Sequence, residues 1–239
     1  MLKMAHISAV ALAGLVAFSA PAAAKAAHRA DATETVQETE RVDRTVQIRA
    51  GGQLRLKNFS GRVVITGSRR GDVAIHAVRH ATRDRLDHIK LEIRETASGI
   101  SIEANKKDDN WTEKNNNVVD TDFDIQVPED ITLDVEVFSS DIKVTDVTGR
   151  QQLHTFSGDI EVAGATASID AETFSGDIEV KLANGAGGHV NFDSFSGSLN
   201  ADSGMVTRSS RGRRVTGDIG SGNNDYHFKT FSGDVRIRD

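Results

Sequence analysis

A four-residue motif, Phe-Ser-Gly-Asp, recurs through the second half of this 239-residue chain and limits the folds that the chain can adopt. Complete, near or degenerate copies begin at residues 138, 156, 174, 195, 215 and 231, and a related segment, Phe59-Ser60-Gly61-Arg62, lies upstream. The separations of 18, 18, 21, 20 and 16 residues are close to one fixed period. A period near 20 residues indicates a stacked repeat architecture, in which each unit contacts its neighbours.

Alternating apolar residues flank each copy of the motif, which predicts a half-buried strand on either side of it. In the third copy, Ala171 and Thr173 set an alternation that would turn Ser175 inward. The next apolar residues are instead Ile178 and Val180, so the phase slips by one residue within the motif. Such a slip requires a corner or bulge, and glycine supplies the backbone freedom for it.

We therefore predict an all-β fold, a β-solenoid (β-helix) with coils of about 18–21 residues, because near-identical copies favour stacking. Stacked coils would place equivalent residues roughly 4.8 Å apart. The Phe, Ile and Val residues would then form ladders in one shared hydrophobic core. The alternative is an antiparallel β-sandwich or meander whose hairpins turn at Ser-Gly-Asp.

The upstream half keeps the two-residue period without the motif, so residues 46–137 and the repeat coils of residues 138–239 are expected to form one β-body. A short helix is expected at Arg83–Lys90 and an exposed loop at Lys106–Asn117. The last copy begins at Phe231, so we expect the C-terminal coil to be the uncapped end of the stack. The expected upstream strands are Val46–Arg49, Leu54–Lys57, Val63–Thr66, Val73–Val78, Ile89–Ile93, Ile100–Glu103, Phe123–Val127 and Leu133–Val137.

The first 24 residues have the pattern of a secretory signal peptide: Lys3, a short apolar run and then small residues. Cleavage is expected after Ala24, with Ala27 as the second choice. Residues 25–45 are polar and aperiodic, which predicts a flexible lead-in. No later apolar run is long enough to span a membrane. These features predict an exported protein, either periplasmic or extracellular at the cell surface.

Composition excludes several function classes. The chain has no Cys, which excludes disulfides, thiolate metal sites and a cysteine nucleophile. A formal net charge of −6 argues against nucleic-acid binding. The sequence contains no glycine-rich phosphate loop, nucleophile elbow or metalloprotease helix. We therefore predict that the protein is not an enzyme and binds no cofactor.

A local cluster of arginines is the candidate contact site for an anionic ligand. It consists of Arg208, Arg211, Arg213 and Arg214. Guanidinium groups bind carboxylates and phosphates through paired hydrogen bonds, so the cluster suits an envelope glycan, a lipopolysaccharide phosphate or an acidic protein surface. The alternative is a solvated loop between coils.

Acidic residues recur at one repeat position. Stacking would place them in a column, which either holds a cation such as Ca²⁺ or accepts backbone N–H groups at each corner. We favour the second interpretation and assign no metal site. Two outward carboxylate pairs, Asp159/Glu161 and Asp177/Glu179, suit a solvated face better than acid–base catalysis. The column comprises Asp141, Asp159, Asp177, Asp218 and Asp234.

Three segments together resemble a bacterial family of exported β-helical proteins, a domain of unknown function whose members are named "putative adhesins". They are Leu54–Gly61, Phe123–Val127 with Pro128, and the serial Phe-Ser-Gly-Asp copies. The resemblance covers residues 46–239 and implies a β-helix and an envelope location. It implies no catalytic residues.

We accordingly predict an exported, non-catalytic β-helical protein, an adhesin or a cell-envelope binding or scaffold module that uses repeated polar faces. Its partner would be an envelope glycan or a surface or membrane protein, and the sequence does not define an oligomeric state. One alternative is a β-helix carbohydrate-active enzyme, a lyase or hydrolase of acidic polysaccharide. The other is an envelope-stress accessory protein that docks a membrane partner.

Overall fold

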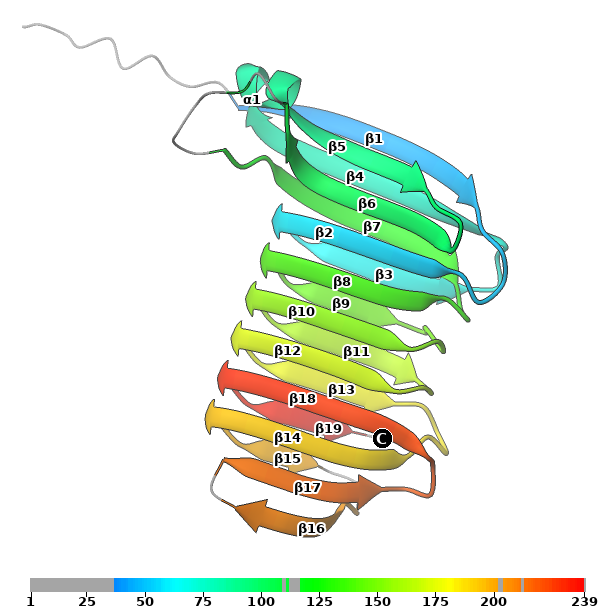
Figure 1. Ribbon diagram of the computed structural model, residues 1–239, viewed down its shortest axis with the longest axis vertical. Coiled ribbons are helices and arrows are strands. Elements are labelled where there is room, and N and C mark those ends of the chain that lie inside the picture. Colours follow the sequence, from blue (N-terminus) through cyan, green and yellow to red (C-terminus); the bar gives the residue numbers. More distant parts are fainter. Residues whose placement is uncertain (1–36, 109–110, 112–116, 202–203, 212, 239) are drawn as a thin grey trace, which may run out of the picture. The chain divides into compact units, whose positions relative to one another are not determined.

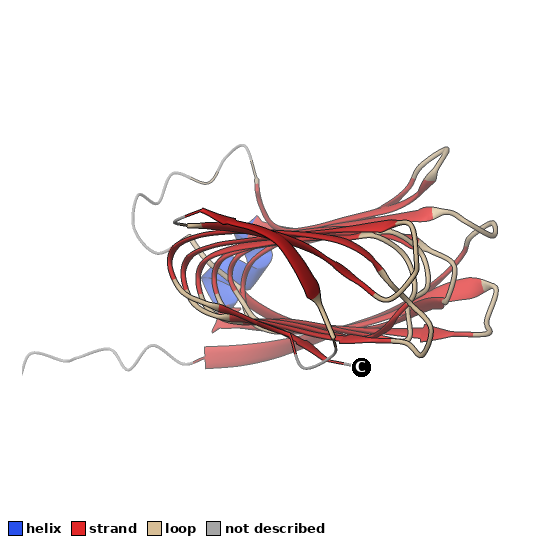
Figure 2. Ribbon diagram, turned by 90° about the horizontal axis from the view of Figure 1, so that it is seen from below, coloured by secondary structure: helices blue, strands red, loops and turns tan. Residues whose placement is uncertain are grey.

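The computed structural model describes residues 37–108, 111, 117–201, 204–211 and 213–238. These residues form two sheets that face each other (Figure 2). The nine-stranded sheet has the order β1 (Gln37–Gln47), β4 (Asp72–Thr82), β7 (Asp120–Pro128), β3 (Val63–Ser68), β9 (Ile142–Thr145), β11 (Ile160–Ala165), β13 (Ile178–Leu182), β19 (Val235–Arg238) and β15 (Leu199–Ala201).

The ten-stranded sheet supplies the other wall of the core. Its order is β16 (Val206–Arg211), β17 (Arg214–Ile219), β14 (Gly188–Ser196), β18 (Asn224–Ser232), β12 (Ile169–Ser175), β10 (Gln151–Ser157), β8 (Thr132–Ser139), β2 (Gln53–Ser60), β6 (Gly99–Lys107) and β5 (Ile89–Glu95). One short helix, α1 (Arg83–His88), connects β4 to β5 where a helix was predicted.

Each motif copy that begins with Phe belongs to one coil that contributes a strand to each sheet, as in the successive coils β10/β11 and β12/β13 (Figure 1). The degenerate copy at residue 215 instead lies within the single strand β17. Neighbouring coils pair in parallel, and equivalent residues are aligned: Leu153 lies beside Ala171, and Ile160 lies beside Ile178. A hairpin meander would pair consecutive strands antiparallel. The structure therefore confirms the β-solenoid and excludes the sandwich alternative.

The motif forms the corner at which the chain passes from one sheet to the other. Thr173 and Ile178 are buried on either side of it, whereas Phe174 and Ser175 are exposed, which is the predicted phase slip. Gly176 has a φ of +153°, and a Cβ atom placed on it would lie 2.1 Å from the carbonyl oxygen of Gly158 in the adjacent coil. Glycine is required here both by the backbone conformation and by the close approach of the next coil.

The core between the sheets is aliphatic, and the motif phenylalanines lie outside it. Ile, Val and Leu residues from successive coils form one continuous buried cluster. The prediction that the motif phenylalanines join this core is wrong, since their rings are 42–51% exposed. The reason is the corner: the chain turns at Phe, so the inward position before it falls on a small residue such as Thr155 or Thr173, which is buried.

The order of the coils in space differs from their order in the chain. The last coil, β18/β19, lies between β12/β13 and β14/β15, and β2/β3 lies between β6/β7 and β8/β9 (Figure 1). The expectation that the C-terminal coil is the uncapped end is therefore wrong. In the ten-stranded sheet, two further strands follow β14 at this end of the stack. Strand β17 pairs antiparallel with β14, and β16 pairs antiparallel with β17.

Strand β1 corrects the predicted lead-in. Residues 37–45 belong to this strand, which pairs antiparallel with β4 at the end of the nine-stranded sheet. The pairing depends on backbone hydrogen bonds with β4, which a search for apolar alternation does not detect. The predicted signal peptide lies outside the described residues and stays a prediction. Among the residues described, no helix has the length and apolar character needed to cross a membrane.

Candidate binding face

Six exposed phenylalanine rings stack along the outward side of the ten-stranded sheet. We call this stack the aromatic ladder. Neighbouring ring centroids are 4.6–4.8 Å apart and the ring planes are within 15° of parallel. The spacing matches the distance between neighbouring strands. In spatial order its members are Phe59, Phe138, Phe156, Phe174, Phe231 and Phe195.

The stacking decides which part of each ring a partner can reach. Ring faces inside the ladder are covered by the neighbouring rings, so the ring edges are what meets solvent. At one end, the guanidinium of Arg213 lies 3.5 Å from the centroid of Phe195 and covers its outer face. The ladder therefore offers an apolar stripe of ring edges rather than flat platforms for sugar stacking.

A row of charged side chains runs parallel to the aromatic ladder, two residues earlier in each strand. We call it the charge row. Lys57 Nζ lies 2.6 Å from Glu136 Oε2, and Lys229 Nζ lies 3.3 Å from Glu172 Oε2. From β6 to β17 its members are Glu103, Lys57, Glu136, His154, Glu172, Lys229, Asp193 and Arg214. The acidic members alternate with basic ones or with histidine, so each carboxylate has an oppositely charged or titratable neighbour.

Electrostatic effects along this row follow from these pairs. The hydrogen bond to Glu136 raises the pKa of Lys57 above its ordinary value. Arg214 donates hydrogen bonds to both oxygens of Asp193, at 2.9 Å and 3.1 Å from Nε and 2.9 Å from Nη2. These hydrogen bonds raise the pKa of Arg214. The carboxylates beside Lys57 and Arg214 therefore favour the charged forms of these two side chains.

A groove of about 460 Å³ lies between the charge row and the aromatic ladder. Its floor includes Thr155, Thr173 and Thr230, and Phe174, Phe231 and Phe195 line one side. Charged side chains of the row line the other side. The aromatic ladder, the charge row and this groove together form the ladder face.

The arginine cluster is divided among different partners. Arg208 pairs with Asp218, Arg214 pairs with Asp193, and Arg213 covers Phe195. Arg211 belongs to β16, and its side chain lies outside the described residues. The structure thus places Arg213 and Arg214 at the end of the ladder face, where Arg213 also borders the groove. Their role as contacts for an anionic ligand stays a prediction.

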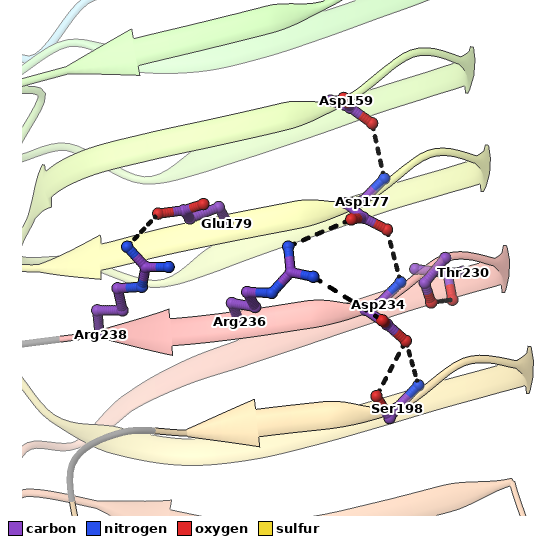
Figure 3. A network of polar contacts seen from close by, with 9 residues as sticks. Asp159, Asp177, Glu179, Ser198, Thr230, Asp234, Arg236 and Arg238 are labelled. Carbon is purple, nitrogen blue, oxygen red and sulfur yellow. Dashed lines mark hydrogen bonds and ion pairs between the residues drawn. The ribbon is translucent and has the colours of Figure 1, made fainter.

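The acidic column forms an inter-coil hydrogen-bond ladder. The backbone N–H of Asp177 donates to Asp159 Oδ1 (2.8 Å), and that of Asp234 donates to Asp177 Oδ1 (2.8 Å) (Figure 3). Asp234 Oδ1 in turn accepts the Ser198 N–H (2.8 Å) and hydroxyl (2.9 Å). These bonds hold the pKa of Asp234 below its ordinary value, the backbone N–H of Ser198 contributing most.

This arrangement refines the favoured interpretation, since each carboxylate accepts an N–H from the next coil rather than from its own corner. Asp218 is the exception, because it lies in β17 and is not part of the column. Partial burial raises its pKa, but hydrogen bonds from His189 and Arg208 outweigh this and lower it.

The predicted carboxylate pairs are separated by their own partners. Glu161 lies 2.7 Å from Lys143 Nζ, and Glu179 lies 3.0 Å from Arg238. Asp177 lies 3.3 Å from Arg236, as Figure 3 shows. Three of these four carboxylates are therefore paired with a cation on the sheet surface, and Asp159 accepts the backbone N–H of Asp177.

Among the described residues, one group has the donor types of a metal site: Asp170, Glu172 and His227, whose candidate ligand atoms lie within 4.8 Å of one another. Glu172 is also paired with Lys229, so a cation would compete with an existing ion pair. Two histidines near each other in the sequence have separate partners, since His76 bonds Asp43 at 2.5 Å and His80 contacts Thr39 at 3.1 Å.

Trp111 stacks on His88 with ring centroids 4.8 Å apart. Its indole Nε1–H donates to Asn117 Oδ1 at 2.5 Å. The Trp111 side chain is therefore anchored through His88 and Asn117.

The chain shows similarity to known proteins at the level of family and fold. Residues 49–238 match the family described as Toastrack DUF4097. A crystal structure described as "a putative cell adhesion protein" from Clostridium sporogenes superposes with a TM-score of 0.61 at 13% identity, covering 83% of this chain and 99% of that one. A "putative adhesin" from Bacteroides fragilis gives a TM-score of 0.29 at 12% identity, covering 83% and 97%. No curated protein matches the sequence.

Proposed function

Because the chain belongs to the Toastrack DUF4097 family, we propose that the mature protein is an exported, non-catalytic β-solenoid that binds a partner at the cell envelope through its ladder face. Export rests on the predicted signal peptide in residues 1–24. The name of the similar Clostridium structure, a "putative cell adhesion protein", agrees with this proposal.

The aromatic ladder is the observation that carries the proposal. Six phenylalanines remain 42–51% exposed at one repeat position. Large apolar side chains gathered in one contiguous stripe mark interaction surfaces in soluble proteins. The adjoining charge row gives the same face polar groups that fix the position of a bound partner.

The geometry favours binding over catalysis. The predicted carboxylate pairs are engaged in ion pairs or accept backbone N–H groups, and the groove lies on the outward side of a sheet. Repetition at 4.6–4.8 Å along the ladder suits many weak contacts in series rather than one reacting centre.

A retention assay tests the proposal. Purified protein is immobilised and exposed to a panel of envelope polysaccharides and to vesicles of the cell envelope. Wild type is expected to retain at least one of these materials, and the double variant F156S/F174S is expected to lose retention at least tenfold. The matched control is K143S/E161S, which removes an exposed pair on the opposite sheet and should retain material as wild type does.

Retention by neither wild type nor control would contradict the proposal, and so would equal retention by F156S/F174S. Shortening of a polysaccharide chain would support the carbohydrate-active alternative. Retention only of vesicles that contain membrane proteins would support the docking alternative. Far-ultraviolet circular dichroism establishes that each variant is folded.

A further inference from the structure

The ten-stranded sheet has a midpoint between β10 and β12, with five strands on each side. The same midpoint divides the aromatic ladder between Phe156 and Phe174, which leaves three rings on each side. A two-fold axis placed there, parallel to the strands, would bring a second ladder face onto the first in the opposite stacking direction. Each ring would then meet a ring.

Under that operation the charge row is complementary to itself. Glu136 of one copy would face Lys229 of the other, and Lys57 would face Asp193. At the centre, His154 would face Glu172, and at the ends Glu103 would face Arg214. The reason is that the charges alternate in sign along the row, as the ion pairs within one chain show. When a row with an even number of alternating members is reversed, each member meets one of the opposite kind.

The next outward-facing row, two residues before the charge row in each strand, also brings no like charges together. Asp134 would face His227, Gln152 would face Asp170, and Arg55 would face Asn191. The operation therefore creates no like-charged pair in either row. Like charges that face each other across an interface disfavour a partner, so their absence is a specific property of this surface.

We propose that the ladder face binds a second copy of this chain, the two ladder faces packing about a two-fold axis parallel to the strands. An isologous contact of this kind uses one patch twice and closes after two copies. The inference rests on the proposed function, because it names the partner of the same face.

The apolar area is sufficient for such a contact. A phenylalanine contributes about 150–250 Å² when fully buried. At the observed exposure of 42–51%, six rings would bury roughly 400–700 Å² per copy. A stable interface buries about 800 Å² per partner. The ladder therefore supplies at least half, and the flanking rows of polar side chains supply the rest.

Sedimentation velocity with charge-reversal variants tests the proposal. Wild type is expected to dimerise, and E136K and K229E are each expected to dissociate at least tenfold more readily, because each places like charges opposite one another twice. An equimolar mixture of E136K and K229E should form a heterodimer as tight as wild type within threefold, because every facing pair is then opposite in sign.

The mixture separates this account from in-chain effects. Each single variant also disturbs a pair within its own chain, Lys57–Glu136 or Glu172–Lys229, and mixing two chains repairs neither pair. The control is K143E, which reverses a charge on the opposite sheet and should leave dimerisation unchanged. A monomeric wild type at 100 µM (on the order of 10⁻⁴ M, a weak limit for specific association) would overturn the proposal. So would single variants that dimerise like wild type, or a mixture that forms no heterodimer.

A second arm distinguishes this proposal from the proposed function. Immobilised protein is exposed to envelopes from cells that produce the chain and from cells in which its gene is deleted. Retention of producing-cell envelopes alone supports a second copy as the partner. Equal retention of both by a monomeric protein overturns the self-association and leaves the proposed function standing. A dimer that retains neither supports the self-association and contradicts envelope binding.

Discussion

The substitution Gly176→Ala tests the close stacking of coils at the motif corner. Its φ of +153° strains any residue with a side chain, and the added Cβ would lie 2.1 Å from the carbonyl oxygen of Gly158. Backbone strain of this kind costs about 1–3 kcal/mol. To relieve the clash the corner must shift by about an ångström, which weakens the hydrogen bond from Gly176 N to Ser232 O (3.2 Å). A weakened bond of this type costs about 1 kcal/mol.

Replacing glycine also lowers the conformational entropy of the unfolded chain, which stabilises the folded state by about 0.4–1 kcal/mol. The expected net loss is therefore about 1–3.6 kcal/mol in the free energy of unfolding. For a body of this length that corresponds to a fall of roughly 2–14 °C in Tm.

Urea denaturation followed by circular dichroism measures this loss. The matched control is Gly71→Ala, because no atom lies within 4 Å of the added Cβ and its φ is not positive. We expect the control to change stability by less than about 0.5 kcal/mol. If Gly176→Ala were as stable as Gly71→Ala, the carbonyl of one coil would not lie against the corner of the next, and the stacking argument would fail.

Three further predictions concern the C-terminal half. Asp234→Ala removes an acceptor of Ser198. Because the folded pKa of Asp234 lies below the ordinary 3.8, the stability that its carboxylate contributes is present above that value and lost as pH falls through the folded pKa. Urea midpoints between about pH 5 and pH 3 should therefore fall less steeply in the variant than in wild type, and parallel curves would contradict this. Deletion of residues 224–239 removes the coil between β12/β13 and β14/β15, so β14 loses its pairing with β18 and limited proteolysis should cleave the coil β14/β15. Protection of β14 in this variant would show that β14 does not depend on β18. Arg214→Ala should lower the urea midpoint slightly at low salt and less at high salt, because the ion pair with Asp193 is exposed and screened by salt. A loss of stability that does not depend on salt would argue for packing instead.

The period of the motif and the alternation around it were sufficient to predict the solenoid. These are local signals, and parallel stacking follows from them because equivalent residues must meet. The corner at Phe-Ser-Gly was predicted for the same reason, since the phase of Ala171 and Thr173 conflicts with that of Ile178 and Val180.

The side on which the phenylalanines lie was predicted wrongly, because the phase slip permits either side and hydrophobicity alone favours the core. The order of the coils also escaped prediction. The copy at residue 231 resembles those at 156 and 174 more closely than does the copy at 195, whose motif ends in Ser198. That likeness is the one signal for its insertion beside β12, where Asp177 accepts the N–H of Asp234.

The charge row shows how the candidate site depended on this order. Six of its eight members stand two residues before a motif phenylalanine, so these six are readable from an alignment of the copies, whereas Glu103 and Arg214 are not. Their alternation is not readable in chain order, in which Glu172 is followed by Asp193 and then Lys229. Only the insertion of β18 between β12 and β14 places Lys229 between the two carboxylates. Similarly, the arginine cluster was recognised as basic, but its division among Asp218, Asp193 and Phe195 depends on tertiary pairing.

Engineered disulfides in this cysteine-free chain test most directly whether the ladder face is assembled by insertion of the last coil. Lys229 lies beside Glu172 on one side and Asp193 on the other, at the spacing of adjacent strands, about 4.8 Å, which a disulfide spans. Glu172 and Asp193 lie two strands apart, about 9.6 Å, which exceeds the roughly 7 Å limit. On mild oxidation of the folded protein, E172C/K229C and D193C/K229C should crosslink within one chain, and E172C/D193C should not. Rapid crosslinking of E172C/D193C, with none in either K229C variant, would contradict the coil order and the ladder face built on it.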